Sequence, residues 1–234
     1  RGEEVPLVRL LRRKPQNFDI QIQDMILRVQ APPDYVEESR AAALSFWDQL
    51  NAYATGHPAF RNAKEPIEVP ETAPDVIKEM VRAARSAGVG PMVTMQGAMT
   101  DQVGRFLARS VSEVRVSSGG DAFVVTKKPV KLTVHRRPDG SGISVVLPPL
   151  EGGIGVSTMP ANRRAAELGV DGLAVVATSC TVADAALAAV QTILAQPRSL
   201  KPALGYLRGI EGVRGGLVIQ GDRIGLAGGV EIAA

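Results

Sequence analysis

The stretch Ser117–Asp121 contains the residues that are best suited to hold a polar ligand. It lies between the β-branched runs 114–116 and 123–125, so it is predicted to connect two strands. Adjacent glycines, Gly119 and Gly120, leave backbone N–H groups uncovered, and Asp121 adds a carboxylate beside them. A plain β-turn explains the same residues, and the pattern alone does not choose between the two interpretations. The stretch indicates a binding site and no reaction, because the sequence contains no complete catalytic constellation.

Other polar side chains could contact a phosphate or a metal ion. Ser157 and Thr158 follow a glycine-rich passage, and their hydroxyl groups could bind phosphate oxygens or cap a local turn. Asp184 lies in the first turn of a predicted helix, where the helix dipole favours a carboxylate. With nearby hydroxyls it could hold Mg²⁺. A capping box that begins at Thr181 is the simpler interpretation of Asp184.

The cysteine and histidine residues exclude several site types. Cys180 is the only cysteine, so the chain forms no internal disulfide, which suits a reducing compartment. It lies where a strand passes into a helix, and we expect a buried thiol without a nucleophilic role. His57 and His135 are far apart in the sequence, so the spacing that is typical of zinc ligands is absent.

Composition predicts an ordinary globular protein. The chain has 234 residues, of which 45% are hydrophobic and 22% charged, and a net charge of +3. Its one basic cluster, Arg9–Lys14, has no interleaved aromatic residues, so we expect no nucleic-acid partner. No apolar run reaches the length of a membrane span, and the sequence shows no signal-type segment. We therefore expect a cytoplasmic protein without a membrane partner.

The pattern of apolar residues predicts both strands and helices. Strands are expected at 18–22, 25–29, 113–117, 122–127, 130–136, 143–147, 172–177, 215–219 and 223–227. Helices are expected at 35–53, 75–87, 97–110 and 182–194, with an irregular crossing at 56–74 and an irregular or short helical stretch after Pro197. The core-facing stripe of the first helix is assigned to Val36, Ala43, Leu44, Trp47 and Leu50. These elements predict one α+β domain over residues 1–234, with helices packed on a mainly antiparallel sheet.

Several motifs resemble an uncharacterised protein family that is related to ApbE. They are Glu65–Glu68, Ala87–Met92, Gln96–Gly104, Ser118–Asp121, Ala183–Ala186 and Gly209–Gly215, and they occur in the family's order over most of residues 15–232. ApbE is an FAD:protein flavin transferase that uses Mg²⁺ to move FMN from FAD onto a threonine. The resemblance implies an ApbE-like, T-fold-like core.

The resemblance also assigns roles to individual residues. Gly97 and Asp101 match the glycine and acid of a K-G-Y-A-x-D run. Gly119, Gly120 and Asp121 match a Gly-Gly-Asp corner that lines the flavin-nucleotide cleft, and Asp184 matches a metal-binding aspartate. Ala188 stands where that metal motif has a hydroxyl ligand, and the H-x-x-D-P segment and its preceding T-S-G are not recognisable.

The resulting hypothesis is a small-molecule site for FAD, FMN or another phosphate-bearing ligand, with Mg²⁺ as a further possible cofactor. Gly119, Gly120, Ser157, Thr158 and either Arg163 or Arg164 are expected to bind its anionic group. Whether the protein is an enzyme of cofactor metabolism is left open. The alternative is a non-enzymatic oligomeric or partner-binding protein that keeps the fold and has lost the flavin-transferase site. In either case we expect a homo-oligomer, for which the closing hairpin at 215–227 could offer a sheet edge.

Overall fold

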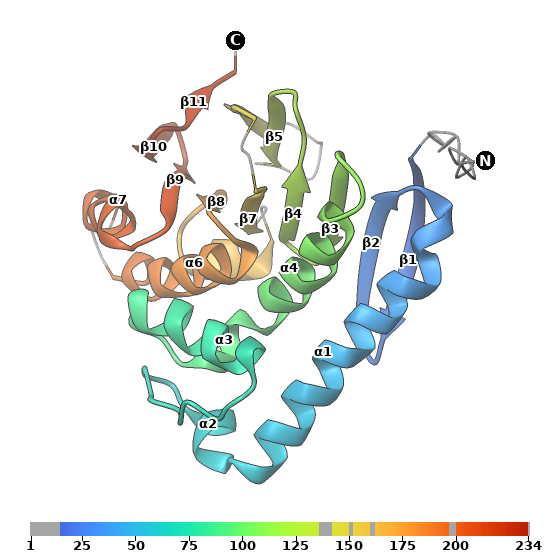
Figure 1. Cartoon of the computed structure of the whole chain (residues 1–234). Coiled ribbons are helices and arrows are strands. Elements are labelled where there is room, and N and C mark those ends of the chain that lie inside the picture. The colour runs from blue at the N-terminus through green and yellow to red at the C-terminus, as the bar shows by residue number, and fades with distance from the viewer. Residues whose placement is uncertain (1–14, 136–141, 150–151, 160–161, 197–199, 234) are drawn as a thin grey trace, which may run out of the picture.

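The computed structural model describes residues 15–135, 142–149, 152–159, 162–196 and 200–233. The basic cluster Arg9–Lys14 lies outside the described residues. The remaining chain forms two sheets and a layer of helices (Figure 1).

The larger sheet has eight strands, and every neighbouring pair in it is antiparallel. In spatial order its strands are β1 (Gln16–Ile22), β2 (Met25–Ala31), β3 (Val114–Ser118), β4 (Asp121–Val125), β7 (Ile154–Met159), β8 (Gly172–Ala177), β9 (Val213–Gln220) and β10 (Arg223–Gly228). The smaller sheet contains β11 (Glu231–Ile232), β6 (Gly142–Leu147) and β5 (Val130–His135), also antiparallel. The predicted α+β class, with helices on a mainly antiparallel sheet, is confirmed.

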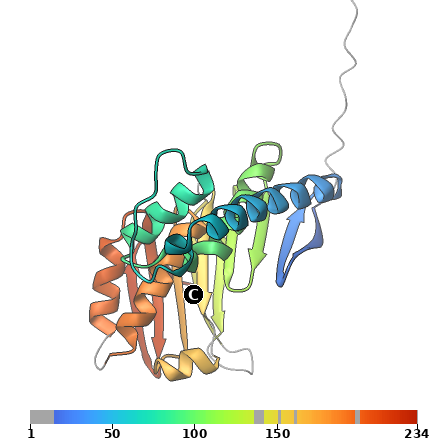
Figure 2. The ribbon, with the colours of Figure 1, turned by 90° about the horizontal axis from the view of Figure 1, so that it is seen from below.

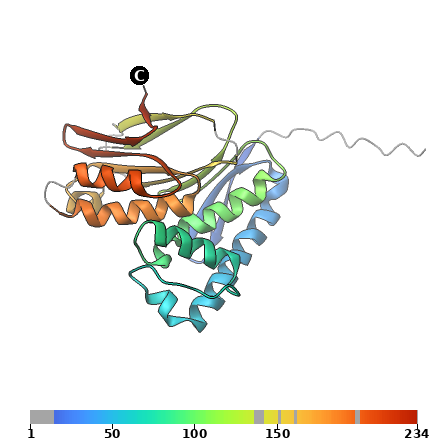
Figure 3. The same cartoon turned by 60° about the vertical axis from the view of Figure 1, so that its left-hand side comes forward.

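The helices gather on one face of the larger sheet (Figures 2 and 3). They are η1 (Pro33–Tyr35), α1 (Val36–Gly56), α2 (Pro58–Asn62), α3 (Asp75–Ser86), η2 (Pro91–Thr94), α4 (Met95–Ala108), α5 (Arg163–Glu167), α6 (Cys180–Leu194) and α7 (Leu200–Gly209). Helices α4 and α6 lie directly on the sheet, and α3 and α1 pack against them. The smaller sheet covers the opposite face near β7–β10, where an apolar cluster including Val145, Val176 and Leu217 joins the two sheets.

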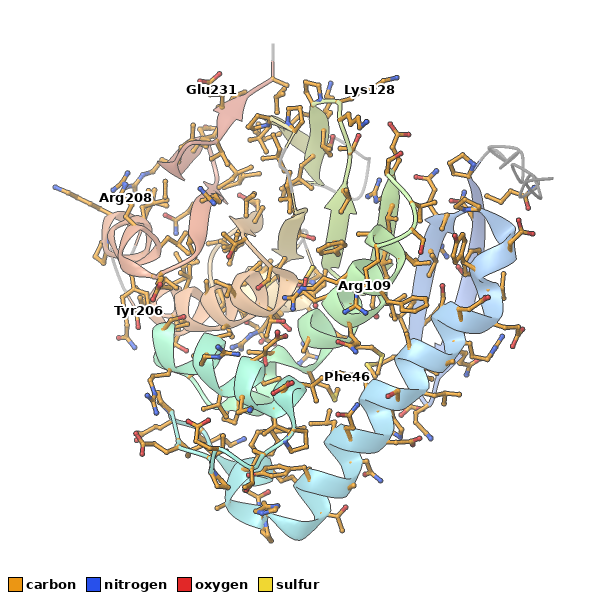
Figure 4. The ribbon with its side chains drawn as sticks, viewed as in Figure 1. Phe46, Arg109, Lys128, Tyr206, Arg208 and Glu231 are labelled. Atoms are coloured by element: carbon orange, nitrogen blue, oxygen red, sulfur yellow. The ribbon has the colours of Figure 1, made fainter. Side chains whose placement is uncertain are left out.

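Several details differ from the expectations, and the central strand β7 was not among the expected strands. The crossing at 56–74 contains the short helix α2, and the stretch after Pro197 contains the ten-residue helix α7. On α1 the core-facing stripe is rotated, because Phe46 is fully buried while Leu44 is exposed and Trp47 is only partly buried (Figure 4). Assigning Leu44 to the core was therefore wrong. Which side chains of a packed helix reach the core depends on the tilt of the helix against its neighbours as well as on its period.

Among the described residues, no helix is long and apolar enough to span a membrane.

Candidate functional site

Gly119 and Gly120 form the two-residue turn of the β3–β4 hairpin, since Ser118 pairs with Asp121. Gly119 has a φ of 56°, a conformation that favours glycine. A Cβ on Gly120 would come within 2.1 Å of the Thr158 carbonyl oxygen, so a side chain does not fit there. The carbonyl oxygen of Gly120 accepts hydrogen bonds from the Thr158 N–H and Oγ1, both at 2.9 Å. Thr158 thus anchors the turn to β7.

The N–H groups of Gly119 and Gly120 donate no hydrogen bond to another residue in the described part of the chain. A tight hairpin leaves such groups open, so this fact alone defines no site. Gln96 adds to it. Its side-chain amide lies 3.4–3.8 Å from the position of a Cβ on Gly119 and makes no hydrogen bond to any other described residue. Gln96 was not predicted as a site residue, although it directly precedes Gly97 in the motif Gln96–Gly104.

Asp121 begins β4 and points toward the helices, as does Phe123 two residues later, which lies against α4. It is 4% exposed and is paired across the sheet with Ser157, whose hydroxyl group hydrogen bonds to it. Burial raises the pKa of Asp121 to about 7, and the Asp101 carboxylate adds to this rise. Near neutral pH, Asp121 therefore exchanges a proton and does not act as a permanent anion.

Asp101 on α4 is buried beside the first turn of α6. Its Oδ1 accepts from the Cys180 N–H at 2.8 Å, and its Oδ2 accepts from the Thr181 N–H at 2.9 Å and Oγ1 at 2.6 Å. Arg105 also donates to Oδ2, at 3.4 Å. Burial raises the pKa of Asp101, while Arg105 and these hydrogen bonds act in the opposite direction. Both oxygens of Asp101 are thus committed to protein partners.

Asp184 does not cap its own helix. Ser179 is the N-cap of α6, because its Oγ accepts from the Val182 N–H at 3.2 Å. The predicted capping box from Thr181 is therefore wrong. Instead, Oδ2 of Asp184 accepts at 3.2 Å from the N–H of Gly97, in the first turn of α4. Burial, and the nearby Asp121 carboxylate, raise the pKa of Asp184 well above its ordinary value.

Cys180 is fully buried between these carboxyl groups, as expected for a thiol without a nucleophilic role. Burial raises the pKa of the thiol, and Asp101 and Asp121 raise it further. A thiol that stays protonated is a poor nucleophile.

Arg163 and Arg164 begin α5, a short helix that follows β7. Their side chains are 94% and 57% exposed, and both form ion pairs with Glu167 at 3.2 and 3.4 Å. No hydrogen bond or ion pair joins either arginine to the Gly119–Asp121 turn. Their proposed contact with an anionic ligand stays a prediction.

The residues of the turn are connected as one cluster, which we call the turn site: Gln96, Gly119, Gly120, Asp121, Ser157 and Asp184. Gln96 lies over Gly119, Asp121 bonds to Ser157, and Asp121 and Asp184 interact electrostatically.

A magnesium ion fits the turn site poorly. Asp184 already spends one oxygen on Gly97, Ala188 supplies no side-chain oxygen, and the described residues contain no group of three His, Cys, Asp or Glu side chains arranged for a metal.

Two grooves lie on the helical face, outside the turn site. One of about 680 Å³ is bounded by α1, α3 and α4, and one of about 630 Å³ by α3 and the start of α6. Glu79 and Arg105, which are joined by two hydrogen bonds of 3.0 Å, line both grooves and separate them. None of the turn-site residues lines either groove.

This fold is the fold of ApbE-like proteins. It is shared by the flavin transferase ApbE from Vibrio cholerae, with a TM-score of 0.58 and 11% identity over 92% of this chain and 97% of that one. The apo flavinyl transferase ApbE from Pseudomonas stutzeri gives a TM-score of 0.60 and 12% identity over 94% of each chain. At such identities the likeness shows the fold alone.

Sequence comparison then shows the family. The family described as AbpE bacteria matches residues 8–201, and the chain belongs to it. A UPF0280 protein from Methanosarcina acetivorans is 25% identical over 93% of this chain and 88% of its own length. Another from Methanocella arvoryzae is 29% identical over 89% and 86%, respectively. The expected membership of an ApbE-like family is thereby confirmed.

Proposed function

We propose that the protein binds a flavin or another phosphate-bearing small molecule at the turn site. The observation that carries this proposal is a combination of groups that bond to no other residue in the described part of the chain: the backbone N–H groups of Gly119 and Gly120, and the carboxamide of Gln96. Together they present several hydrogen-bond donors that bond to no acceptor among the described residues. Backbone N–H groups in a turn are donors that phosphate oxygens commonly accept from.

The buried carboxyl groups are compatible with an anionic ligand. The pKa of Asp121 is about 7, so near neutral pH its carboxyl group carries a proton for much of the time, and burial raises the pKa of Asp184 well above its ordinary value. A protonated carboxyl group does not repel a phosphate, and it can donate a hydrogen bond to it. Binding is therefore expected to weaken as the pH rises above about 7, the pKa of Asp121.

The fold and family support a flavin as the first ligand to test. Two solved structures that share the fold are named as flavin transferases. Flavin transfer has less support than flavin binding. Asp101 and Asp184 accept hydrogen bonds that position helices, and Ala188 has no side-chain oxygen to bind a metal ion. We therefore propose flavin or nucleotide binding and leave the group transferred, if any, to the experiment.

Thermal unfolding of the protein with FAD, FMN, ADP or inorganic phosphate, each with and without Mg²⁺, tests the proposal. We expect FAD or FMN to raise the melting temperature, and a rise that needs Mg²⁺ would favour transferase chemistry. Gln96→Ala should reduce the ligand-induced rise. Gln102→Ala, which alters the same helix outside the turn site, should not. No rise with any of these ligands would refute the proposed function.

The alternative is a non-enzymatic protein that keeps the fold. Asp101 and Asp184 favour this alternative, because they accept hydrogen bonds from helix N-termini and so stabilise the fold without any ligand. Asp184→Ala separates the two proposals. Loss of the FAD response at unchanged stability assigns Asp184 to a ligand site, whereas loss of stability with an unchanged response assigns it to the fold.

A further inference from the structure

The two edges of the larger sheet differ in whether their backbone groups are already bonded. Strands β1 and β10 form these edges, on opposite sides of the molecule (Figure 1). Each is joined to its neighbour by a two-residue turn, so the residues that flank the turn form a hydrogen-bonded pair. In that pair the N–H and C=O groups point toward the neighbouring strand. In the next residue along the edge strand they point away from the sheet, and the two orientations alternate from there on.

The β10 edge is partly covered. Its outward residues are Ile224, Leu226 and Gly228, and the Leu226 carbonyl accepts a hydrogen bond of 3.1 Å from Nη2 of Arg208. Arg208 belongs to α7, which lies beside this edge (Figure 4). A charged side chain across an edge strand is a common way of preventing further strand pairing. The closing hairpin is thus poorly suited to add another strand.

The β1 edge has no such cover among the described residues. Its outward residues are Asn17, Asp19 and Gln21, and no hydrogen bond to their backbone groups from another described residue is present outside the β1–β2 ladder. The strand contains no lysine, proline or bulge, although Pro15 precedes it. Seven residues are long enough to pair with another strand.

We propose that β1 pairs antiparallel with β1 of a second copy of this chain, forming a two-fold symmetric dimer. An antiparallel edge is complementary to itself, since each outward residue offers one donor and one acceptor. Placing the axis at Asp19 sets Asn17 of one copy opposite Gln21 of the other. Their exposed carboxamides can then exchange hydrogen bonds.

The same register explains how the charge at the centre is tolerated. The two Asp19 carboxylates meet at the axis, where like charges destabilise a strand pair. Each carboxylate has its own partner, because Arg28 of β2 lies 3.3 Å from Asp19. Since Arg208 covers the opposite edge, association stops at two copies and does not extend into a fibre.

Sedimentation equilibrium on the full chain tests the assembly, over about 1–100 μM because small polar interfaces are weak. We expect a dimer that Asn17→Lys/Gln21→Lys converts to a monomer, since the new lysines face each other across the interface. Ile224→Lys on the β10 edge should leave the dimer intact. Circular dichroism of each variant confirms that the subunit remains folded.

Cross-linking tests the register directly. Residues opposite each other in a hydrogen-bonded pair have Cα atoms about 5.5 Å apart, within the range of a disulfide. Asp19→Cys should give a covalent dimer on mild oxidation, and Ile224→Cys should not. Cys180 is fully buried, so it will not compete. A wild-type monomer at the highest concentration, or a dimer that persists in Asn17→Lys/Gln21→Lys, would overturn the proposal.

Discussion

Asp101 and Asp184 each bond to the N-terminus of the helix that carries the other. Asp101 lies on α4 and accepts from the first N–H groups of α6, whereas Asp184 lies on α6 and accepts from the Gly97 N–H at the start of α4. Each carboxylate supplies an acceptor for donors that a helix start leaves without intrahelical partners. Because the relationship is reciprocal, the two helices fix each other's position over the strands that carry Asp121 and Ser157.

Asp101→Ala is expected to destabilise the protein by about 2–4 kcal/mol, because it leaves two buried N–H groups and the Thr181 hydroxyl without their acceptor. Asp101→Asn, which keeps one acceptor oxygen, should cost less. Urea unfolding followed by circular dichroism measures both changes. Unchanged stability of Asp101→Ala, accompanied by loss of ligand binding, would show that Asp101 belongs to the ligand site.

Asp121 should make stability depend on pH in the direction opposite to an ordinary salt-bridged aspartate. Its pKa is about 7 in the folded protein, against an ordinary value of 3.8, so between these values the folded state binds more protons than the unfolded state. The contribution of Asp121 to the free energy of unfolding therefore falls as the pH rises from about 4 to about 7 and then levels off.

Asp121→Asn should flatten this dependence and raise the free energy of unfolding at pH 8 by roughly 1–4 kcal/mol. Urea unfolding at pH 5, 6, 7 and 8 measures the slope. Asp24→Asn, in the exposed β1–β2 turn, serves as the control and should leave the slope unchanged. A wild-type protein whose stability rises between pH 5 and 7 would contradict the assigned state of Asp121.

Gly155 is where β7 touches the start of α6. A Cβ at this position would come within 1.9–2.2 Å of the Ser179 carbonyl group and the Cys180 nitrogen, which are backbone atoms and cannot rotate away. Gly155→Ala is therefore expected to destabilise the protein by about 3 kcal/mol or more. Gly56→Ala, where no atom lies within 4 Å of the added methyl group, should change stability little. Equal stability of the two variants would disprove this close contact.

Replacing both Arg163 and Arg164 by alanine is expected to change stability by no more than about 0.5 kcal/mol, because their ion pairs with Glu167 are exposed. The same variant tests their predicted contact with an anionic ligand. If they bind it, the FAD- or FMN-induced rise in melting temperature should shrink. A full response in the double variant would remove them from the site.

Local sequence patterns predicted much of the fold. Alternating or continuous apolar runs located most of the strands, although not β7, which is rich in glycine and hydroxyl residues. Gly119–Gly120 was correctly placed between two strands, because turn chemistry depends on neighbouring residues. The stripe on α1 was less predictable, since Phe46 and Leu44 are both apolar and only the tilt of the helix decides which is buried. Helix α7 was missed as a full helix because Pro202 and Gly205 weaken its local preference, which packing of Leu200, Ala203 and Leu207 overcomes.

The sequence by itself determined the class of fold, the family motifs and the hairpin corner that ends in Asp121. Only the tertiary structure decided what the acids do. Asp101 and Thr181 are 80 residues apart, and Asp184 and Gly97 are 87 apart, so no local pattern could pair them. Their contacts depend on the crossing of α4 and α6, where the backbones approach closely at Gly97. A carboxylate's role follows from the donors around it, and packing alone brings those donors within hydrogen-bonding distance.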